Sequence, residues 1–434
     1  MLRPLSKLCM SLLWSVAFLV ACKSMPPTLL SSPTPADRVE RPIVVSEEHL
    51  QVLAEGPRYI GLIRNVSGET QGSITLHVET VDSNGGVVAT EAIHPLLPIL
   101  APNLVSPFVL DLKDTNTFGE VTYRIGKVES ESVNTSTSIG LEIIGLKVFQ
   151  VGSDTAEVVG ELKNTGSVPI QVEELAGVAF GGKGELLDST LANVGRQVIL
   201  PGGRGPFRMS FNTLQESLTV QIYPLARPSQ LTTSPAAEIY VVGSPVGFVD
   251  PSGRYHLVGE IVNRGDQSAL VWLTGALLSS TGEILDAANT TVPLFVLAPR
   301  EHMPFDFDDF PIASGIPAAG SKVAKYSIQV NLLNSQEANL TPIFLSVSQS
   351  QLRGTAGSLY ATVKVTNSSL SETRGAVLVA TAKNRAGQVV GAGNSVFFQA
   401  LKIGGTVELA VPLSVDPDEM LEDLTLEVVV QALP

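Results

Sequence analysis

The stretch VVGELKN at residues 158–164 recurs along the chain and decides its fold. YIGLIRN fills 59–65, LVGEIVN fills 257–263, and a looser copy, TVKVTN, fills 362–367. The last residue of each copy is an asparagine, and the four are spaced by 99, 99 and 104 residues: Asn65, Asn164, Asn263 and Asn367. A period near 100 residues matches one small domain, so the repeat predicts four domains in tandem.

Two further landmarks follow each asparagine in the same order. A turn glycine before aliphatic residues lies 19 or 20 residues downstream, at Gly85, Gly184, Gly282 and Gly387. A Pro-Phe pair follows in the first three repeats, with its proline 41 or 42 residues beyond the asparagine, at Pro107, Pro206 and Pro304. The fourth repeat keeps LKIGGTVEL at 401–409 but lacks the Pro-Phe pair.

Each repeat alternates with a period of two, which is typical of a β-strand with one buried face. In VVGELKN the inner face is predicted to hold Val158, Gly160, Leu162 and Asn164, and in the sequence after Pro206 it holds Phe207, Met209 and Phe211. The predicted outer face carries polar residues: Arg64, Glu161, Lys163, Glu260, Arg208 and Ser210. Turn residues every 8–12 positions complete the pattern. We therefore predict an all-β chain of four tandem immunoglobulin-like β-sandwich domains.

The asparagines are predicted to have a structural role. Each closes an inner face where the strand must turn, and a short amide side chain can bond the nearby loop backbone. The glycine four residues earlier, as in Gly160, is predicted to let another strand or a bulky core ring approach closely. A folding role for the repeated phrase is favoured over a binding site.

The repeat and the flanking composition divide the chain into six segments. We expect a signal peptide at 1–21 and a proline-rich tether at 22–42. The four domains are expected at 43–133, 138–232, 236–337 and 340–434.

The N-terminus has the plan of a secretory signal peptide, with Arg3 and Lys7 before an apolar run at 8–21. Its end, LVAC at 19–22, resembles the lipobox of bacterial lipoproteins, with Cys22 at the lipidated position. The resemblance implies diacylation of Cys22 and cleavage before it. Only Cys9 and Cys22 occur, so the mature chain would have no intrachain disulfide. An ordinary signal peptide with a chance cysteine is the alternative.

The longer pattern resembles the FxLYD-type family of bacterial immunoglobulin-like domains over nearly the whole mature chain. It runs G-x-aliphatic-x-N, then a turn glycine with aliphatics, then L-x-P-x-x-x-x-P-F. The pattern departs from the family at the Tyr-Asp before the turn glycine, where only Asp82 comes near. The resemblance implies a module of envelope and secreted proteins that usually carries no enzymatic residues.

The composition argues against nucleic acid as a partner, because the net charge is −14 and the pI is about 4.9. The chain has five histidines: His49, His77, His94, His256 and His302. None recurs at one landmark, and no G-x-S-x-G or H-E-x-x-H spacing is present. We expect no catalytic site, metal or cofactor.

Two acidic clusters and one tryptophan are candidate binding sites. DFDDF at 306–310 and DPDEMLED at 416–423 contain several carboxylates, but Asp306 and Asp308 are expected to point to solvent along one strand rather than converge on calcium. Trp272 lies among apolar neighbours on both sides. It is expected to be a core ring rather than a sugar-stacking platform.

The sequence thus predicts a lipid-anchored extracytoplasmic stalk or binding protein of the bacterial cell envelope. It would contact the membrane through Cys22, and another envelope protein or a polymer through its domains. Lys23 in place of a retention-type aspartate favours the outer membrane if two membranes exist. The alternatives are a carbohydrate-binding surface lipoprotein and a hydrolase with an unrecognised site. The oligomeric state stays open.

Overall fold

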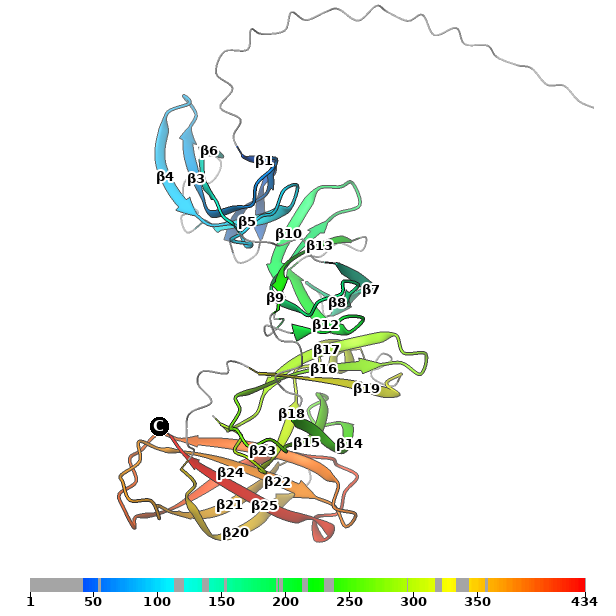
Figure 1. The fold of residues 1–434 in the computed structure, drawn as a ribbon, viewed down its shortest axis with the longest axis vertical. Coiled ribbons are helices and arrows are strands. Elements are labelled where there is room, and N and C mark those ends of the chain that lie inside the picture. Colours follow the sequence, from blue (N-terminus) through cyan, green and yellow to red (C-terminus); the bar gives the residue numbers. More distant parts are fainter. Residues whose placement is uncertain are drawn as a thin grey trace, which may run out of the picture. The chain divides into compact units, whose positions relative to one another are not determined.

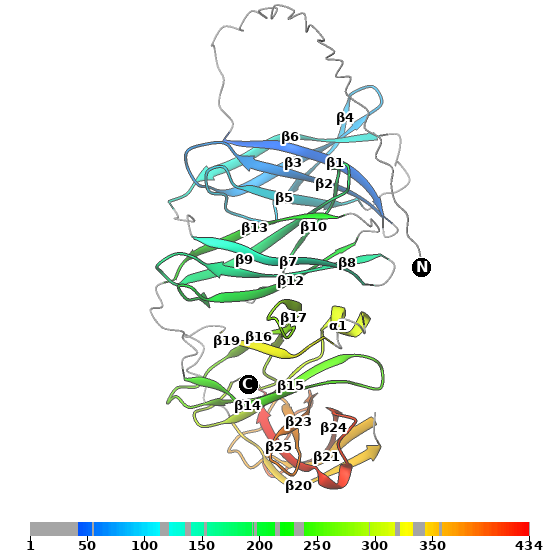
Figure 2. The ribbon, with the colours of Figure 1, turned by 90° about the vertical axis from the view of Figure 1, so that its right-hand side faces the viewer.

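The computed structural model describes residues 42–433, apart from 54–55, 113–120, 135–139, 152–153, 193, 195–197, 213–217, 230–237, 295, 317–321, 333–342 and 356–357 (Figures 1 and 2). Residues 41–434 form one compact unit. The predicted signal peptide, Cys22 and most of the tether lie outside the described residues.

The first two domains are each built from two antiparallel sheets. In the first, β1-β2-β5 faces β4-β3-β6, with bounds β1 Ile43–Leu53, β2 Gly56–Asn65, β3 Gln71–Asp82, β4 Val87–Ile93, β5 Val105–Asp111 and β6 Val121–Ser132. In the second, β7-β8-β12 faces a sheet centred on β9, with bounds β7 Leu141–Val151, β8 Thr155–Asn164, β9 Ile170–Phe180, β10 Leu186–Leu191, β11 Val198–Ile199, β12 Arg204–Asn212 and β13 Thr219–Pro228.

The third domain repeats the plan and the fourth modifies it. The third pairs β14-β15-β18 with β17-β16-β19, bounded by β14 Ile239–Val249, β15 Tyr255–Asn263, β16 Val271–Leu278, β17 Ile284–Thr291, β18 His302–Phe307 and β19 Lys325–Leu332. In the fourth, β23 also pairs β24 and joins both sheets into one, with bounds β20 Ser346–Thr355, β21 Ser358–Thr366, β22 Ala376–Lys383, β23 Val389–Phe397, β24 Thr406–Val415 and β25 Thr425–Ala432.

The prediction of an all-β, immunoglobulin-like multidomain fold is confirmed by these sheets. Helical structure in the described part is short, namely α1 at Pro311–Gly315 and a 3₁₀ turn at Leu421–Asp423. No helix within the described ranges is long and apolar enough to cross a membrane. The expected domain boundaries remain predictions.

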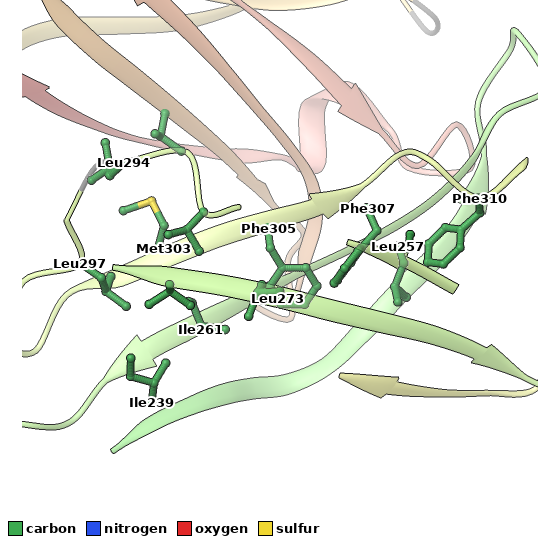
Figure 3. Close-up of a cluster of buried hydrophobic side chains, with 14 of the residues drawn as sticks. Ile239, Leu257, Ile261, Leu273, Leu294, Leu297, Met303, Phe305, Phe307 and Phe310 are labelled. Carbon is green, nitrogen blue, oxygen red and sulfur yellow. The ribbon is translucent and has the colours of Figure 1, made fainter. Parts of the chain in front are cut away.

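The glycine of the repeated phrase makes room for the phenylalanine of Pro-Phe. The two face each other in the strand register as Gly61 with Phe108, Gly160 with Phe207 and Gly259 with Phe305. A β-carbon at Gly259 would lie 2.4 Å from Phe305 Cζ, far inside contact distance. The predicted close approach of a core ring is thus confirmed, and Figure 3 shows Phe305 among the buried side chains of the third domain.

The prediction of one buried and one exposed strand face is wrong for the central strand of the third domain. Every residue of β15 is buried, including Glu260, which was expected on a solvent-facing side. The physical reason is that the outer face of this sheet lies against the next domain, where Val258 packs with Val389. The inner face agrees with expectation, as Phe207, Met209 and Phe211 of the second domain are all buried.

Candidate functional site

The four repeated asparagines share one loop geometry. Each is buried, and its side-chain NH₂ donates to two backbone carbonyls, which for Asn164 belong to Val168 at 2.8 Å and Ile199 at 2.9 Å. Its Oδ1 accepts the N–H of the residue two positions on, Gly166 at 2.9 Å. Equivalent bonds are made by Asn65, Asn263 and Asn367. The prediction that this amide bonds the loop backbone is confirmed, and both N–H donors of each asparagine side chain are used within the loop.

The junctions between successive domains are apolar and buried. The outer face of the β1-β2-β5 sheet packs on the second domain through Ile60, Leu62 and Val105 against Val178, Phe180 and Leu186. At the next junction Val159 of β8 packs with Ala276, Ile284, Ala287 and Ile312 of the third domain. At the last one Val258 and Phe248 pack with Val389, while Val377 and Val379 of β22 join the core of the third domain.

Each junction also carries a charged or polar pair. Arg58 Nη1 lies 3.5 Å from Asp188 Oδ1 at the first, and Arg208 Nη2 lies 2.6 Å from Asp309 Oδ2 at the second. At the third, Lys383 Nζ lies 3.0 Å from Oε1 of the buried Glu260. Each pair gives a partner to a charged side chain that packing between the domains would otherwise bury without one.

A cavity of about 670 Å³ lies between the third and fourth domains. Its lining is rich in side chains that exchange hydrogen bonds with polar ligands: Thr290, Thr291, Ser358, Asn394 and Ser414. Asp250, Arg254, Asp306 and Asp308 supply its charges. A second cavity, of about 530 Å³, lies between the first and second domains, beside Glu47, Arg64 and Tyr223.

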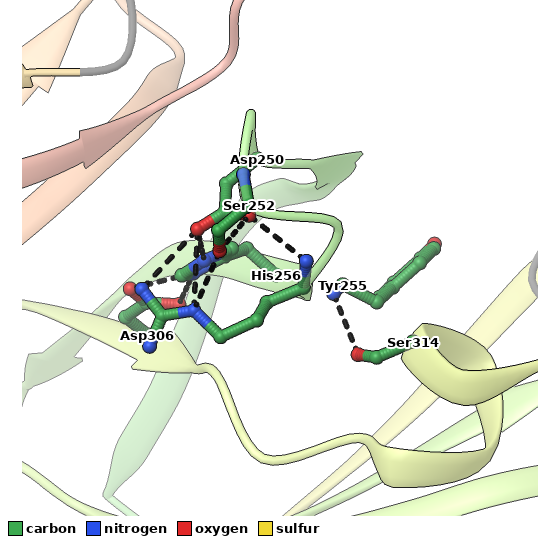
Figure 4. A network of polar contacts seen from close by, with 7 residues as sticks. Asp250, Ser252, Tyr255, His256, Asp306 and Ser314 are labelled. Carbon is green, nitrogen blue, oxygen red and sulfur yellow. Dashed lines mark hydrogen bonds and ion pairs between the residues drawn. The ribbon is translucent and has the colours of Figure 1, made fainter. Parts of the chain in front are cut away.

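His256 is the centre of a buried network behind the larger cavity (Figure 4). Its Nδ1 lies 3.0 Å from Asp306 Oδ1, its Nε2 lies 3.4 Å from Asp250 Oδ2, and its ring stacks on Phe248. Burial works against a charged ring, but the hydrogen bonds and charges of Asp306 and Asp250 prevail and raise the pKa of His256. Burial also opposes ionisation of Asp250, yet the donors Ser252, Arg254 and His256 hold its pKa well below the usual range.

This network does not have the arrangement of a hydrolase triad. A general-base histidine needs one ring nitrogen on a carboxylate and the other on a nucleophile. Both nitrogens of His256 face carboxylates instead, and the hydroxyl of Ser252 donates to Asp250 at 2.7 Å. Both ring nitrogens are thus engaged by carboxylates, and neither is directed at a hydroxyl that could serve as a nucleophile.

The other candidate histidines are not brought together. His77 Nε2 lies 3.5 Å from Glu129 Oε2, His94 Nδ1 lies 2.9 Å from the carbonyl of Ile74, and His302 Nδ1 lies 3.1 Å from Glu260 Oε2. His49 is on β1 and is exposed. In the part of the chain that the structure describes, no group of three histidine, cysteine or acidic residues has the geometry to hold a metal.

Two expectations about single residues need correction. Asp306 does not simply point to solvent, because the pairing of Val258 with Asp306 across β15 and β18 brings its carboxylate to His256. Trp272 is half-buried rather than a core ring, and its indole N–H donates to Asn289 Oδ1 at 3.4 Å.

In the second acidic cluster, the N–H of Asp418 donates to Asp416 Oδ1 at 3.0 Å, within a loop that continues into the 3₁₀ turn.

Sequence reasoning missed Asp250 and the buried junction faces. Asp250 begins a turn, DPSGR at 250–254, six residues before His256, but its contact with the ring depends on the fold of that turn. The junction faces did leave a signal. The residue five positions before the asparagine is apolar in the first three repeats, Ile60, Val159 and Val258, and is Thr362 in the fourth.

Comparison with known proteins identifies no family for this chain. No family model matches it, and no curated protein matches it. Among solved structures, native Escherichia coli alpha-2-macroglobulin matches 86% of this chain and 27% of its own length at 9% identity and a TM-score of 0.13. The elastase-activated form of that protein matches 87% of this chain and 41% of its own length at 12% identity and a TM-score of 0.14.

A Salmonella alpha-2-macroglobulin mutant matches 86% of this chain and 28% of its own length at 14% identity and a TM-score of 0.12. The chain therefore spans between about a quarter and two fifths of the solved chains it matches. TM-scores this low carry no argument about its function. What the described residues establish is an all-β array of immunoglobulin-like domains with buried junctions.

Proposed function

We propose that this chain is a lipid-anchored, extracytoplasmic protein of the bacterial cell envelope that acts as a non-catalytic stalk or binding module. The observation that carries the proposal is the buried apolar packing at all three junctions. Packing of this kind holds neighbouring domains in a defined relation, which suits a spacer or a docking surface more than a set of independently moving domains.

The N-terminal sequence supports the anchored location. LVAC at 19–22 matches the lipobox pattern, and a diacylated Cys22 would supply two acyl chains, enough for stable membrane attachment. The G-x-aliphatic-x-N pattern supports membership of the FxLYD-type modules of envelope proteins. Outer-membrane residence, where two membranes exist, rests on Lys23 after the cysteine.

The chemistry of the His256 network supports a non-catalytic role. Both ring nitrogens of His256 are engaged by the carboxylates of Asp306 and Asp250, which line the larger cavity, so the ring has no free position for proton transfer. The partner of the module is accordingly proposed to be another envelope protein or a polymer, recognised through loops and strand edges.

In-cell crosslinking with mass spectrometry tests the proposal, comparing wild type with Cys22→Ser. We expect one envelope partner to be captured by the wild type and lost in the variant, and a fatty-acid label to be incorporated only by the wild type. Absence of the fatty-acid label from the wild type, or equal labelling of both forms, would contradict the anchor. Absence of any specific capture by a correctly anchored wild type would contradict the stalk-and-docking function.

A carbohydrate-binding role is the second candidate, favoured by the hydroxyl- and amide-lined cavity between the third and fourth domains. Such side chains exchange hydrogen bonds with sugar hydroxyls. A glycan array tests this, with Asn394→Ala and Ser414→Ala as variants that should abolish a genuine signal. Residue Val88, exposed on β4 of the first domain, provides a matched control variant, Val88→Ser, that should retain it.

A further inference from the structure

The three most exposed large hydrophobic side chains among the described residues all lie on two loops of the fourth domain. Leu370 is 98% exposed, Phe398 is 79% exposed and Ile403 is 62% exposed. Scattered single apolar residues on a surface are ordinary, but three gathered on neighbouring loops mark an interaction surface.

The two loops, 368–375 and 398–405, are joined by hydrogen bonds and lie side by side. Thr373 and Leu401 exchange backbone hydrogen bonds at 3.1 Å in both directions. The side-chain amide of Asn367 donates to the carbonyl of Leu401 at 2.7 Å, and its backbone N–H donates to the carbonyl of Gly405 at 3.0 Å. The hydroxyl of Ser369 donates to Asn367 Oδ1. The loops are therefore fixed, and the apolar side chains are presented to solvent by an ordered framework.

The repeat framework does not require apolar residues at these positions. The residue three positions after the asparagine is Gly68, Ser167 or Asp266 in the first three repeats, and Leu370 in the fourth. Ile403 stands where the other repeats have Pro102, Pro201 and Pro299, just before the left-handed residue of the turn. Leu370 and Ile403 are thus features of the fourth domain alone, whereas the position of Phe398 holds the buried Leu97 and Leu294 in the first and third domains.

The charge around the loops favours one kind of partner. Lys402 precedes Ile403 and Arg374 follows the paired Thr373, and both are exposed with no ion-pair partner among the described residues. Glu372 is the one acidic residue in the two loops, so this end carries a local excess of positive charge in a chain of net charge −14. Apolar side chains on projecting loops, flanked by cations, suit an anionic lipid surface.

We propose that loops 368–375 and 398–405 bind an anionic membrane surface, with Leu370, Phe398 and Ile403 inserting among the lipid headgroups and Lys402 and Arg374 contacting the phosphates. This contact is separate from the anchor proposed at Cys22. It gives the protein a second, reversible membrane attachment through its fourth domain.

The chain contains a matched control at the opposite end of the same domain. Met420 is 58% exposed, but its loop carries Asp416, Asp418, Glu419 and Glu422. This loop lies beside the turn that follows β22, since Asn384 donates to Glu419 Oε1 at 3.1 Å, whereas Thr373 precedes β22. Met420 is thus also a large apolar side chain and is nearly as exposed as Ile403, but acidic residues flank it in the loop.

Depth-dependent fluorescence quenching tests the proposal. Full-length Phe398→Trp and Met420→Trp would be mixed with vesicles of phosphatidylcholine and phosphatidylglycerol carrying bromine on the acyl chains, with the parent chain as background. We expect quenching for Phe398→Trp and none for Met420→Trp. Absence of quenching at position 398, or equal quenching at both positions, would overturn the proposal.

Vesicle flotation of the Cys22→Ser chain separates this contact from the anchor. In that background, Leu370→Ser/Phe398→Ser/Ile403→Ser should weaken binding by roughly tenfold or more, whereas Met420→Ser should not. Lys402→Glu should weaken it roughly fivefold on anionic vesicles. If the triple variant instead abolishes a concentration-dependent dimer without altering flotation, the surface binds a second copy and the membrane proposal is wrong.

Discussion

Val363 and Leu409 face each other across β21 and β24 at the register position where the first three domains pair a glycine with a phenylalanine. The fourth domain lacks the Pro-Phe pair and has exchanged a small-large pair for two residues of intermediate size. Because interiors are close-packed, such a change is tolerated only when both partners change together. The glycine and the phenylalanine of the other domains are therefore one packing unit.

Gly259→Ala tests this unit. Its β-carbon would lie 2.4 Å from Phe305 Cζ, and we expect a loss of about 1–3 kcal/mol in the free energy of unfolding from overpacking. Adding Phe305→Leu to the same chain should recover part of the lost free energy of unfolding, because the smaller side chain leaves room for the β-carbon at position 259. Urea unfolding measures both, and Gly68→Ala is the control because nothing lies within 4 Å of its β-carbon. An additive double variant would contradict the pairing.

Asn164→Ala tests the loop asparagine. The change removes the donor to the carbonyls of Val168 and Ile199 and the acceptor for the N–H of Gly166. Leaving such groups unpaired in a buried loop should lower the free energy of unfolding by about 3 kcal/mol. Chemical denaturation checks this against Asn212→Ala, whose exposed side chain should matter little. Equal stability of the two variants would show that the amide is dispensable.

The repeated phrase predicted the strands, the inner face and the loop asparagine, because all three depend on contacts within one repeat. The outer face could not be predicted in the same way. Glu260 was expected in solvent from its place in an alternating strand, yet Lys383 of the next domain lies 3.0 Å from it. A charged residue at an outward position indicates solvent only when no second domain covers that face.

The His256 network was unpredictable for a related reason. His256 and Asp306 are 50 residues apart, and their contact depends on the pairing of β15 with β18, in which Leu257 faces Phe307. An alternating pattern fixes which face a residue occupies, but not which residue of the neighbouring strand stands beside it. The sequence pattern placed Asp306 on the correct strand but predicted solvent around its carboxylate, where the structure has His256.

Val159→Asp tests the buried junctions. Val159 is fully buried against the third domain, so a carboxylate there should disrupt packing between the second and third domains and cost about 3 kcal/mol or more. Thr362→Asp is the matched control, since Thr362 has the equivalent place in the fourth domain and is only half-buried. Thermal unfolding with limited proteolysis at the junction measures the effect. Comparable losses of stability in both variants would mean that burial at this junction does not contribute to the stability of the protein.

Stability should fall as the pH rises above neutrality because of His256. Asp306 and Asp250 raise its pKa in the folded protein above the value of about 6.5 that it has when unfolded. The folded state therefore binds this proton more tightly. The stabilisation of the folded state by protonated His256 is fully present below about pH 6.5, and it is lost as the pH rises through the pKa of His256 in the folded protein.

Each tenfold gain in proton affinity on folding is worth about 1.4 kcal/mol of this pH-dependent stability. Histidine NMR titration should place the pKa of His256 above 6.5, and Asp306→Asn should lower it by removing the nearer carboxylate charge. In His256→Gln, the free energy of unfolding should change less between pH 6 and 9 than in the wild type. Parallel pH profiles for the two proteins would mean that His256 stays neutral between its carboxylates, and the network would then be an ordinary hydrogen-bonded cluster rather than a buried ion triplet.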